Sequence, residues 1–504
     1  MVAFTQTVAF EGVEARLVEV QCALSPGIPS FSIVGLPDKA VSEAKERVRA
    51  ALATLCIALP SQRITVNLSP ADLPKEGSHF DLPIAIALLA ALEIIPQDIA
   101  AEYVALGELS LDGKLVSVLG ALPSAMSAAE ENLSLICPSG SGAEAAWVGA
   151  TPVYRAQTLT QVIQHMTSSA PLPLCLPGEV TGETFSRDFA DVKGQERAKR
   201  ALEIAAAGGH HVLMVGTPGS GKSMLAARLP SILPPLSPQE ALETSMIHSL
   251  AGLLDEGGIS RARPFREPHH TASMAAIVGG GRGAQPGEIS LAHNGVLFLD
   301  EFPEFPRTTL ETLRQPIETG EVMVARANAH IRYPCRFMLV AAANPCKCGY
   351  LSESTRACSR APVCGEDYLG RISGPLMDRF DLRVEVPPVS FHDLDLPSKG
   401  EPSQVIRARV TKAREIQTAR VSKGLTAKVN SDLEGSELEA LAEPDTEGRA
   451  LLNKVAERYG LSARGYHRIL RVARTVADLD ASETVRLAHV SEAISYRLAF
   501  TKEL

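Results

Sequence analysis

The chain has 504 residues, a formal net charge of −9, 45% hydrophobic residues, 21% charged residues and 9 cysteines. Its length predicts roughly two to four domains, and its composition is ordinary for a soluble globular protein. The negative charge balance excludes a broadly basic surface, so nucleic-acid binding would need a local positive region such as a lined pore. The cysteine count is odd and most cysteines are scattered, which argues against a disulfide framework and favours a reducing cytoplasm.

No segment has the pattern of a membrane span or of a secretory signal. The longest apolar run, 84–92, is too short to cross a bilayer. No basic region precedes an apolar core at the N-terminus. We therefore expect a cytoplasmic protein without membrane contact.

The first block, residues 1–165, alternates short β-like stretches with helical ones. This alternation predicts an α/β or α+β domain. Strands are expected at 15–20, 30–34, 63–68 and 133–137, and helices at 39–55 and 82–92.

Two stretches of this block, 67–77 and 106–113, resemble the proteolytic domain of the Lon family, whose fold is that of the ribosomal S5 domain 2-like superfamily. The resemblance places His79 where that family has its catalytic serine, and Ser124 where it has its catalytic lysine. A serine–lysine dyad needs a nucleophile beside an amine. The resemblance therefore implies the fold and argues against proteolysis, and we interpret the domain as a structural or DNA-contacting platform. A displaced dyad is the alternative, drawn from Ser78, Lys75 and Lys114.

A linker rich in Pro, Ser and Gly is predicted at 166–187, and a second domain at 188–390. The start of this domain, 189–195, precedes a helical run that ends near Ala207. It resembles the segment that packs on adenine in AAA+ ATPases, which implies that Val192 and Gly194 contact the nucleotide. A plain amphipathic helix with a polar start is the alternative interpretation.

The most informative motif is a glycine-rich loop between a short apolar strand, 211–215, and a predicted helix, 224–229. Strand, loop and helix in this order form a phosphate-binding P-loop. Its glycines let backbone N–H groups turn toward phosphate oxygens, and the helix N-terminus adds a partial positive charge. Lys222 would reach the β- and γ-phosphates, and Ser223 would ligate Mg²⁺. The loop residues are Gly216, Thr217, Pro218, Gly219, Ser220, Gly221, Lys222 and Ser223.

A second apolar stretch, 295–299, ends in two acids, Asp300 and Glu301. This is the Walker B arrangement, in which Asp300 would hold Mg²⁺ and Glu301 would orient the attacking water. Together with the P-loop it predicts a hydrolytic ATPase that uses ATP and Mg²⁺.

Between these two motifs lie the adjacent histidines His269 and His270 and a glycine-rich run, 278–287. Metal binding by the two histidines is not favoured, because the side chains of adjacent residues in an extended chain point in opposite directions. The glycine run predicts a mobile loop or a hairpin tip. Four arginines in this region could contact a phosphate backbone: Arg261, Arg263, Arg266 and Arg282. An ordinary solvated loop is the alternative interpretation.

Three stretches, 264–271, 287–301 and 313–318, together resemble the Mg-chelatase-like AAA+ ATPase family, and the likeness extends over nearly the whole chain. The resemblance implies a homo-oligomer, a hexameric ring, that acts as a DNA helicase on single-stranded and branched DNA. It further implies branch migration during natural transformation, with a recombinase as a further partner. The implied fold is an α/β AAA+ P-loop core with a helical lid, preceded by the S5 domain 2-like domain.

The same resemblance assigns further parts of the motor. Residues 321–333 would form a hairpin that lines the pore, unless it is a surface hairpin without function. Asn344, at the end of the strand 337–343, takes the sensor 1 position. Arg379 takes the position of the arginine finger, which reaches into the neighbouring subunit, with Arg371 as the alternative. The DNA-facing residues of the hairpin would be Arg326, Asn328 and His330.

After a second linker, 391–403, the block 404–504 is predicted to be helical and to form the AAA+ lid. Arg464 takes the sensor 2 position, which contacts the γ-phosphate bound by the same chain, and Arg468 is the fallback. The basic face of an exposed helix is the alternative interpretation.

A cysteine cluster lies between sensor 1 and the arginine finger: Cys346, Cys348, Cys358 and Cys364. Four thiols in so short a stretch favour a tetrahedral zinc site that would close a loop without its own core. The spacing is not the usual Cys-x₂-Cys pair, so reduced structural thiols and a redox pair are the alternatives.

Two other functions compete with the DNA motor. One is the ATPase subunit of magnesium chelatase, a protein remodeller, and the other is an ATP-dependent protease. The additional N-terminal domain and the cysteine cluster argue against the first, and His79 and Ser124 argue against the second.

Overall fold

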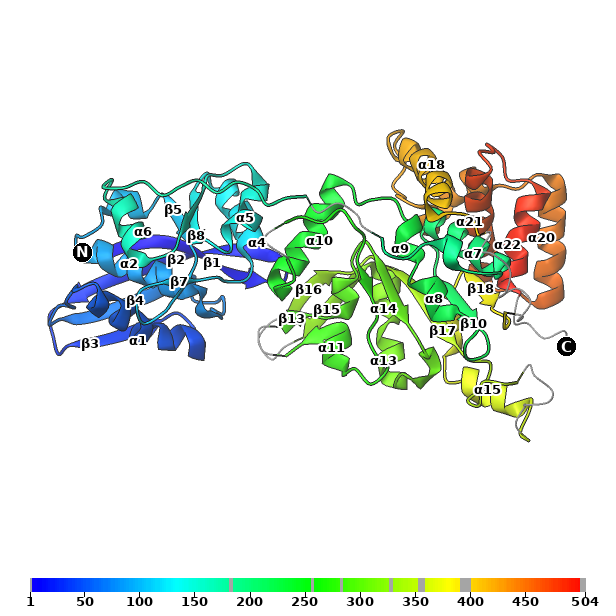
Figure 1. Cartoon of the computed structure of the whole chain (residues 1–504), viewed down its shortest axis with the longest axis horizontal. Coiled ribbons are helices and arrows are strands. Elements are labelled where there is room, and N and C mark those ends of the chain that lie inside the picture. Colours follow the sequence, from blue (N-terminus) through cyan, green and yellow to red (C-terminus); the bar gives the residue numbers. More distant parts are fainter. Residues whose placement is uncertain are drawn as a thin grey trace.

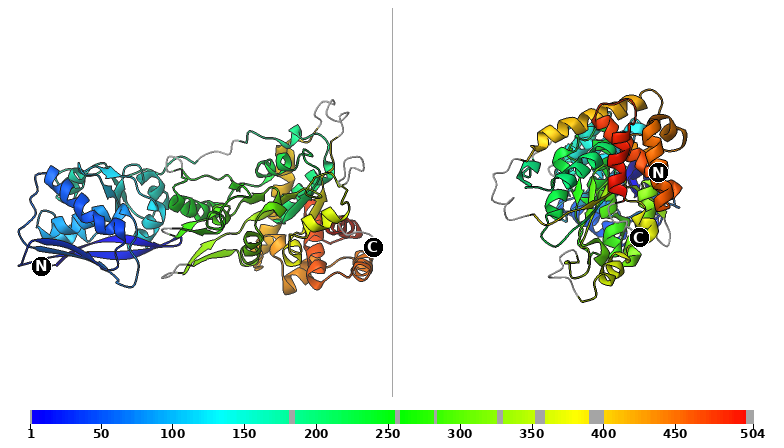
Figure 2. Two further views of the ribbon diagram at one scale, coloured as in Figure 1. Left: turned by 90° about the horizontal axis from the view of Figure 1, so that it is seen from below. Right: turned by 90° about the vertical axis from the view of Figure 1, so that its right-hand side faces the viewer.

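The computed structural model describes residues 2–180, 185–254, 258–281, 284–325, 330–351, 359–389 and 400–498. Three bodies follow one another along an elongated molecule, with the two ends of the chain at opposite ends (Figures 1 and 2). The N-terminal domain occupies one end, a parallel-sheet core lies in the middle, and a helical lid occupies the other end. In the described ranges, no helix combines the length and the apolar character needed to cross a bilayer.

The N-terminal domain is built on a seven-stranded sheet with the strand order β3-β4-β2-β1-β5-β8-β9. Its strands are β1 Val2–Glu11, β2 Glu14–Ser25, β3 Ser30–Val34, β4 Arg63–Ser69, β5 Tyr103–Ala105, β8 Ser134–Pro138 and β9 Val153–Ala156, with a small separate pair, β6 Glu108–Leu109 and β7 Leu115–Val116. Its helices are α1 Lys39–Thr54, α2 Asp81–Ala91, α3 Gln97–Ala100, α4 Ala121–Glu130, α5 Gly142–Ala145 and α6 Leu159–Met166.

The strands and helices predicted from the periodicity of this block are confirmed. Helix α2 is apolar on all sides, and its residues 82–90 are buried, as expected for a helix enclosed between a sheet and α1. The sequence prediction missed β1, which pairs antiparallel with β2 along its whole length. Residues 173–175 run along β9 through two backbone hydrogen bonds, so part of the predicted linker lies against this domain.

The core is a five-stranded parallel sheet in the order β11-β14-β17-β10-β18. The first strand in the chain therefore lies between the fourth and the fifth, as in AAA+ cores. Its strands are β10 Val212–Val215, β11 Phe265–Arg266, β14 Val296–Leu299, β17 Met338–Ala343 and β18 Leu382–Glu385. The helices around it are α7 Glu196–Gly208, α8 Lys222–Ala226, α9 Leu229–Ile232, α10 Pro238–Ala251, α11 Met274–Val278, α12 Glu288–Leu291, α13 Arg307–Thr312, α14 Arg314–Thr319, α15 Val363–Leu369 and α16 Gly374–Met377.

Two hairpins extend from the core. The first pairs β12 Gly279–Gly280 with β13 Gln285–Pro286, and the second pairs β15 Glu321–Ala325 with β16 His330–Pro334. The Tyr333 hydroxyl donates a hydrogen bond to the Ala284 carbonyl oxygen over 2.9 Å, so the two hairpins lie against each other. Phe10 and Val13, on either side of the β1–β2 turn, pack on the cluster that contains Ile331 and Tyr333. In the same turn, the Cβ position of Gly12 would lie 2.6 Å from the Arg332 carbonyl oxygen, so the N-terminal domain contacts strand β16 of the second hairpin.

The lid consists of α18 Ser403–Val421, α19 Gly435–Ala442, α20 Thr446–Tyr459, α21 Ala463–Leu479 and α22 Leu487–Arg497. Its attachment centres on Asp381, which is buried directly before β18. The Asp381 carboxylate accepts hydrogen bonds from Arg468 of α21 and from the backbone N–H of His211, and it lies 3.2 Å from Nδ1 of His210. Burial raises the pKa of Asp381, but the Arg468 guanidinium and the hydrogen bond with His210 outweigh this effect and hold the pKa well below its usual range. The lid is therefore fixed to the edge of the sheet at which β10 and β18 begin.

Candidate nucleotide site

The P-loop leaves the carboxyl end of β10 and opens into α8. Gly219 and Gly221 have φ angles of +77° and +92°, which favour glycine, and no other atom lies near the positions where a Cβ would be. Successive residues in such conformations turn their N–H groups toward one concave surface, which suits an anion. The loop thus leaves room for phosphate oxygens above the start of α8.

Lys222 is 7% exposed, and its ammonium group is held inside the loop. It donates to the carbonyl oxygens of Gly216 over 2.8 Å and of Thr217 over 3.0 Å, and to Oδ1 of Asn344 over 3.2 Å. Burial lowers the pKa of Lys222, while the nearby charges of Asp300 and Glu301 counteract that shift. The structure therefore brings together Lys222, Asn344 and the two acids after β14, which the sequence predicts to be the P-loop lysine, the sensor 1 residue and the Walker B pair.

The residues predicted to hold Mg²⁺ meet at the same edge of the sheet. The Ser223 hydroxyl donates to Oδ2 of Asp300 over 2.6 Å, and the Glu301 backbone N–H donates to Oδ1 of the same carboxylate over 2.8 Å. Glu301 has a φ of +50°, in the left-handed region that costs free energy for a residue other than glycine. A hydroxyl and a carboxylate this close form the oxygen ligands that Mg²⁺ prefers.

Two buried hydroxyls offer a further test of the fit to a nucleotide. Thr217 Oγ1 and Ser220 Oγ have no hydrogen-bond partner among the described residues, although both side chains are buried. Buried polar groups without partners cost free energy, so such groups are commonly satisfied by a ligand or water. The donors of the loop therefore fit the phosphates of ATP.

The structure corrects the expectation about the two histidines. Their rings do not point in opposite directions but lie against each other, with centroids 4.1 Å apart. His270 Nδ1 lies 3.3 Å from a carboxylate oxygen of Glu301, so this ring positions the Walker B glutamate. No local sequence pattern indicates this contact, because it depends on the pairing of β11 with β14.

Of the residues assigned to the adenine, Val192 is buried in the core cluster, whereas Gly194 lies in a turn with open space beside it. Gln195, which the sequence analysis did not single out, has a direct contact with the P-loop. Its side-chain amide donates to the carbonyl oxygens of Ser220, over 3.2 Å, and of Pro387. The segment therefore connects the P-loop to the chain that follows β18.

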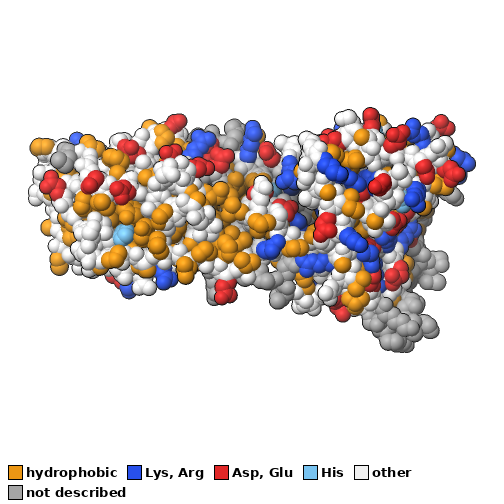
Figure 3. Space-filling view, turned by 90° about the horizontal axis from the view of Figure 1, so that it is seen from above, with side chains coloured by type: hydrophobic (Ala, Val, Ile, Leu, Met, Phe, Trp, Pro, Cys, Tyr) orange, Lys and Arg blue, Asp and Glu red, His pale blue; other side chains and the backbone are white. Residues whose placement is uncertain are grey.

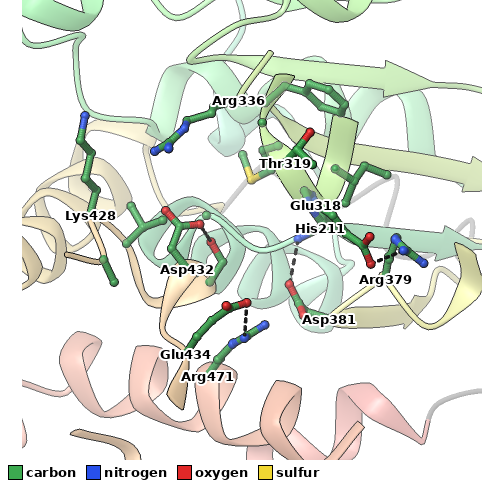
Figure 4. A pocket seen from close by; sticks show the side chains of 18 of the residues that line it. His211, Glu318, Thr319, Arg336, Arg379, Asp381, Lys428, Asp432, Glu434 and Arg471 are labelled. Carbon is green, nitrogen blue, oxygen red and sulfur yellow. Dashed lines mark hydrogen bonds and ion pairs between the residues drawn. The ribbon is translucent and has the colours of Figure 1, made fainter. Parts of the chain in front are cut away.

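Arg379 and Arg464 lie at the other edge of the sheet. Both line a cavity of about 950 Å³ between the core and the lid, together with residues that precede β10 and β14 (Figure 4). Strand β17 has six residues and spans about 20 Å, which gives the separation of this edge from the P-loop edge. The expectation that Arg464 contacts the γ-phosphate of its own chain is therefore contradicted.

The two arginines of the cavity differ in their contacts. Arg379 is 5% exposed, forms an ion pair with Glu318 and donates to the Pro375 carbonyl oxygen over 2.5 Å, and burial lowers its pKa. Arg464 is exposed at the start of α21. Of the alternatives, Arg371 is ion-paired with Glu304, and Arg468 is bound to Asp381.

The arginines that were predicted to face DNA differ in their contacts. Arg263 pairs with Glu240, and Arg266 forms a two-pronged ion pair with Glu288 at 2.6 and 2.7 Å. Both side chains thus form ion pairs within the core, and a phosphate contact for them stays a prediction. Arg261 donates to the Leu236 carbonyl oxygen over 3.2 Å. Arg282, Arg326 and Asn328 lie outside the described residues, and His330 is placed only by its backbone, as the first residue of β16.

In the N-terminal domain, the positions that correspond to the Lon dyad are buried and bonded to the backbone. His79 Nε2 lies 2.9 Å from the Val8 carbonyl oxygen, and burial lowers its pKa to about 4. The Ser124 hydroxyl donates to the Gly120 carbonyl oxygen over 2.6 Å. The Lys75 ammonium donates to the Pro70 carbonyl oxygen, and no contact with Ser78 is found among the described residues. This arrangement provides no activated nucleophile.

The strand order, the P-loop and the acids at the end of β14 define a P-loop ATPase of the AAA+ class. Family models agree: residues 188–394 match "Magnesium chelatase, subunit ChlI", residues 18–141 match "Subunit ChlI of Mg-chelatase", and residues 400–497 match "Magnesium chelatase, subunit ChlI C-terminal". ATP and Mg²⁺ are the cofactors that this family implies.

Three known proteins with similar sequences indicate which type within this family the chain resembles. The chain is 45% identical to competence protein ComM of Haemophilus influenzae, over 96% of this chain and 95% of that protein. It is 43% identical to the uncharacterized protein YifB of Escherichia coli, over 96% and 95%. It is 27% identical to the magnesium-chelatase 38 kDa subunit of Rhodobacter capsulatus, over 66% of this chain and 93% of that protein. The chain belongs to the Mg-chelatase-like family of AAA+ ATPases, ComM type.

A contact on the outside of the P-loop allows a direct test of the site. Gly349 has a φ of +84°, and a Cβ at this residue would lie 2.5 Å from Cγ of Pro218. We expect Gly349→Ala to displace the P-loop and to raise the Kd for a fluorescent ATP analogue roughly tenfold, since small displacements at such sites are costly.

Gly424→Ala is the matched control for this substitution. Gly424 has a similar φ of +103°, with nothing near its Cβ position, so it reproduces the backbone strain without the collision. Equal nucleotide affinity for the two variants would show that the contact with Pro218 does not position the P-loop.

Proposed function

We propose that this chain is the subunit of a hexameric ring ATPase that moves along single-stranded and branched DNA. As a helicase, it would promote branch migration during the recombination of incoming DNA in natural transformation. The main observation in support of a ring is the distance between the P-loop and the two arginines of the cavity. A chain that keeps Arg379 and Arg464 at the opposite edge of its sheet needs a neighbour to supply the charges that stabilise phosphoryl transfer.

The DNA-binding part of the proposal rests on the two hairpins. The predicted contact residues are Arg282, Arg326 and Asn328, which lie outside the described residues, and His330, the first residue of β16. The hydrogen bond between Tyr333 and Ala284 supports a joint role, because it holds the hairpins together. In a ring, such paired hairpins could line the central hole and follow a phosphate backbone.

The distribution of surface charge is compatible with this assignment. On the face shown in Figure 3, Lys and Arg side chains are frequent over the core and the lid, with Asp and Glu among them, whereas hydrophobic side chains form a broad patch over the N-terminal domain. The exposed side chains of Leu174 and Leu176 belong to that domain. With a net charge of −9, a motor that binds DNA needs such a local concentration of positive charge.

The relatives favour DNA over a chelatase partner. The competence protein matches almost the whole chain, whereas the chelatase subunit leaves about a third of it unmatched. A recombinase would be the functional partner of such a motor. A chelatase-type remodeller would instead respond to a protein partner, and this difference can be measured.

We expect single-stranded DNA to raise the ATPase rate of the wild-type protein several-fold. Lys222→Ala should lower kcat/KM for ATP by more than about 100-fold, with or without DNA, because it removes the ammonium group from the phosphate site. Lys454→Ala, on an exposed face of the lid, is the control and should behave like wild type. Strand displacement on a three-stranded junction should likewise be lost in Lys222→Ala and unchanged in Lys454→Ala. An ATPase that is indifferent to every DNA tested, yet rises with a protein partner, would favour the remodeller.

A mixing experiment tests the shared site. Arg464→Ala and Lys222→Ala should each be inactive alone, and an equal mixture should recover about a quarter of the wild-type ATPase rate. Random assembly places an intact P-loop beside an intact arginine at about one interface in four. Arg458→Ala, an exposed lid arginine that stacks on Tyr459, should remain active alone. A mixture as inactive as its components would place Arg464 in the site of its own chain.

A further inference from the structure

The segment between Asn344 and Arg379 leaves the core sheet at the end of β17 and returns through α15. Three of its cysteines converge, and the sulfur atoms of Cys346, Cys348 and Cys364 all lie within 4.8 Å of one another. The sulfurs of Cys346 and Cys348 are 2.9 Å apart, and Cys346 is completely buried. Residues from the two sides of the segment thus point their thiols at one common position.

The spacing of the sulfurs matches one metal ion better than a cluster of metals. Zinc–sulfur bonds of about 2.3 Å in a tetrahedron place neighbouring sulfurs about 3.8 Å apart, so small movements of these thiols would complete the geometry. An iron–sulfur cluster sets its thiolates farther apart, because several metal and sulfide atoms stand between them. Zinc is therefore the ion that this arrangement fits.

The cysteine segment lies directly on the nucleotide site. Gly349, in the turn after Cys348, approaches Pro218 of the P-loop so closely that a Cβ would lie 2.5 Å from its ring. The turn itself is closed by a hydrogen bond of 2.9 Å from the Gly349 N–H to the Cys346 carbonyl oxygen. A bond that fixes Cys346 and Cys348 would therefore also fix the surface on which the P-loop rests.

The other end of the segment reaches the Walker B side of the site. Tyr368 of α15 is buried, and its pKa is raised by burial and by the neighbouring Glu304. Arg371, two residues after α15, is ion-paired with the same Glu304 at 3.2 Å. Because Glu304 follows Glu301 by one helical turn, the segment connects the P-loop to the loop of the catalytic glutamate.

We propose that Cys346, Cys348 and Cys364 bind one zinc ion, and that this ion holds the segment against the P-loop. The three thiols lose their protons on binding, no electrons are transferred, and a fourth ligand completes the tetrahedron. Cys358, the fourth cysteine of the sequence cluster, lies outside the described residues. The effect on nucleotide affinity rests on the ATPase function, whereas the metal site itself is independent of any action on DNA.

The metal content of the full-length protein tests the site. Mass spectrometry of the purified chain after gel filtration should find one zinc per chain in the wild type. The double variant Cys346→Ser/Cys364→Ser should retain less than about a tenth of that amount, because two of the described ligands are lost. Cys56→Ser/Cys175→Ser removes two thiols elsewhere and is the matched control, which should keep its zinc. Iron in place of zinc, a disulfide in the intact mass of the wild type, or zinc retained by the first variant would overturn the proposal.

A second measurement does not depend on a variant that folds. A mercurial thiol reagent added to the wild type should release zinc to a coloured indicator. It should also weaken binding of a fluorescent ATP analogue roughly tenfold, as expected if the P-loop loses its support. Restoring the thiols with dithiothreitol and adding zinc should reverse both effects. Release of zinc without any change in nucleotide affinity would overturn the coupling to the P-loop.

Discussion

The buried carboxylate of Asp381 joins the lid to the core and thereby places the arginines of the cavity. One buried carboxylate receives Arg468 from the lid and two contacts from the residues that precede β10. Removing one partner of such a buried group is costly, so the lid is firmly held at the amino-terminal edge of the sheet. Arg464 lies one helical turn before Arg468, and Arg379 lies two residues before Asp381. Both arginines are therefore positioned by this contact, away from the phosphates that their own chain would bind.

The N-terminal domain has a comparable role for the hairpins. It contacts the core through the β1–β2 turn, which packs beside β16, and through Ser249, which donates to the buried carboxylate of Glu144 over 3.1 Å. The positions that would make this domain a protease are occupied by side chains bonded to its own backbone. In the proposed motor, the domain would hold the hairpins in place, and movements of the P-loop edge would reach them through β17 and β14.

Much of the fold and part of the site could be predicted because their signals are local. The P-loop and the acids after β14 each occupy a few consecutive residues whose chemistry fixes their geometry, and the periodicity of 39–55 and 82–92 gave both helices. Contacts between distant segments could not be predicted. The contact of His270 with Glu301, the ion pairs of Arg263 and Arg266, and the place of Arg464 depend on which surfaces meet. Residues 173–175 were assigned to a linker because Pro and Ser lack a strand pattern, although their backbone pairs with β9.

If the arginines that complete each site come from a neighbouring subunit, one chain alone cannot turn over ATP, and a dilution series can detect this. ATPase activity per chain would be measured with Mg²⁺ and ATP over a range of protein concentrations, with the oligomer fraction determined by mass photometry at each point. We expect activity per chain to fall in proportion to the fraction of chains in the oligomer and to vanish for monomers. Monomers that hydrolyse ATP at the rate of the assembled protein would contradict this expectation.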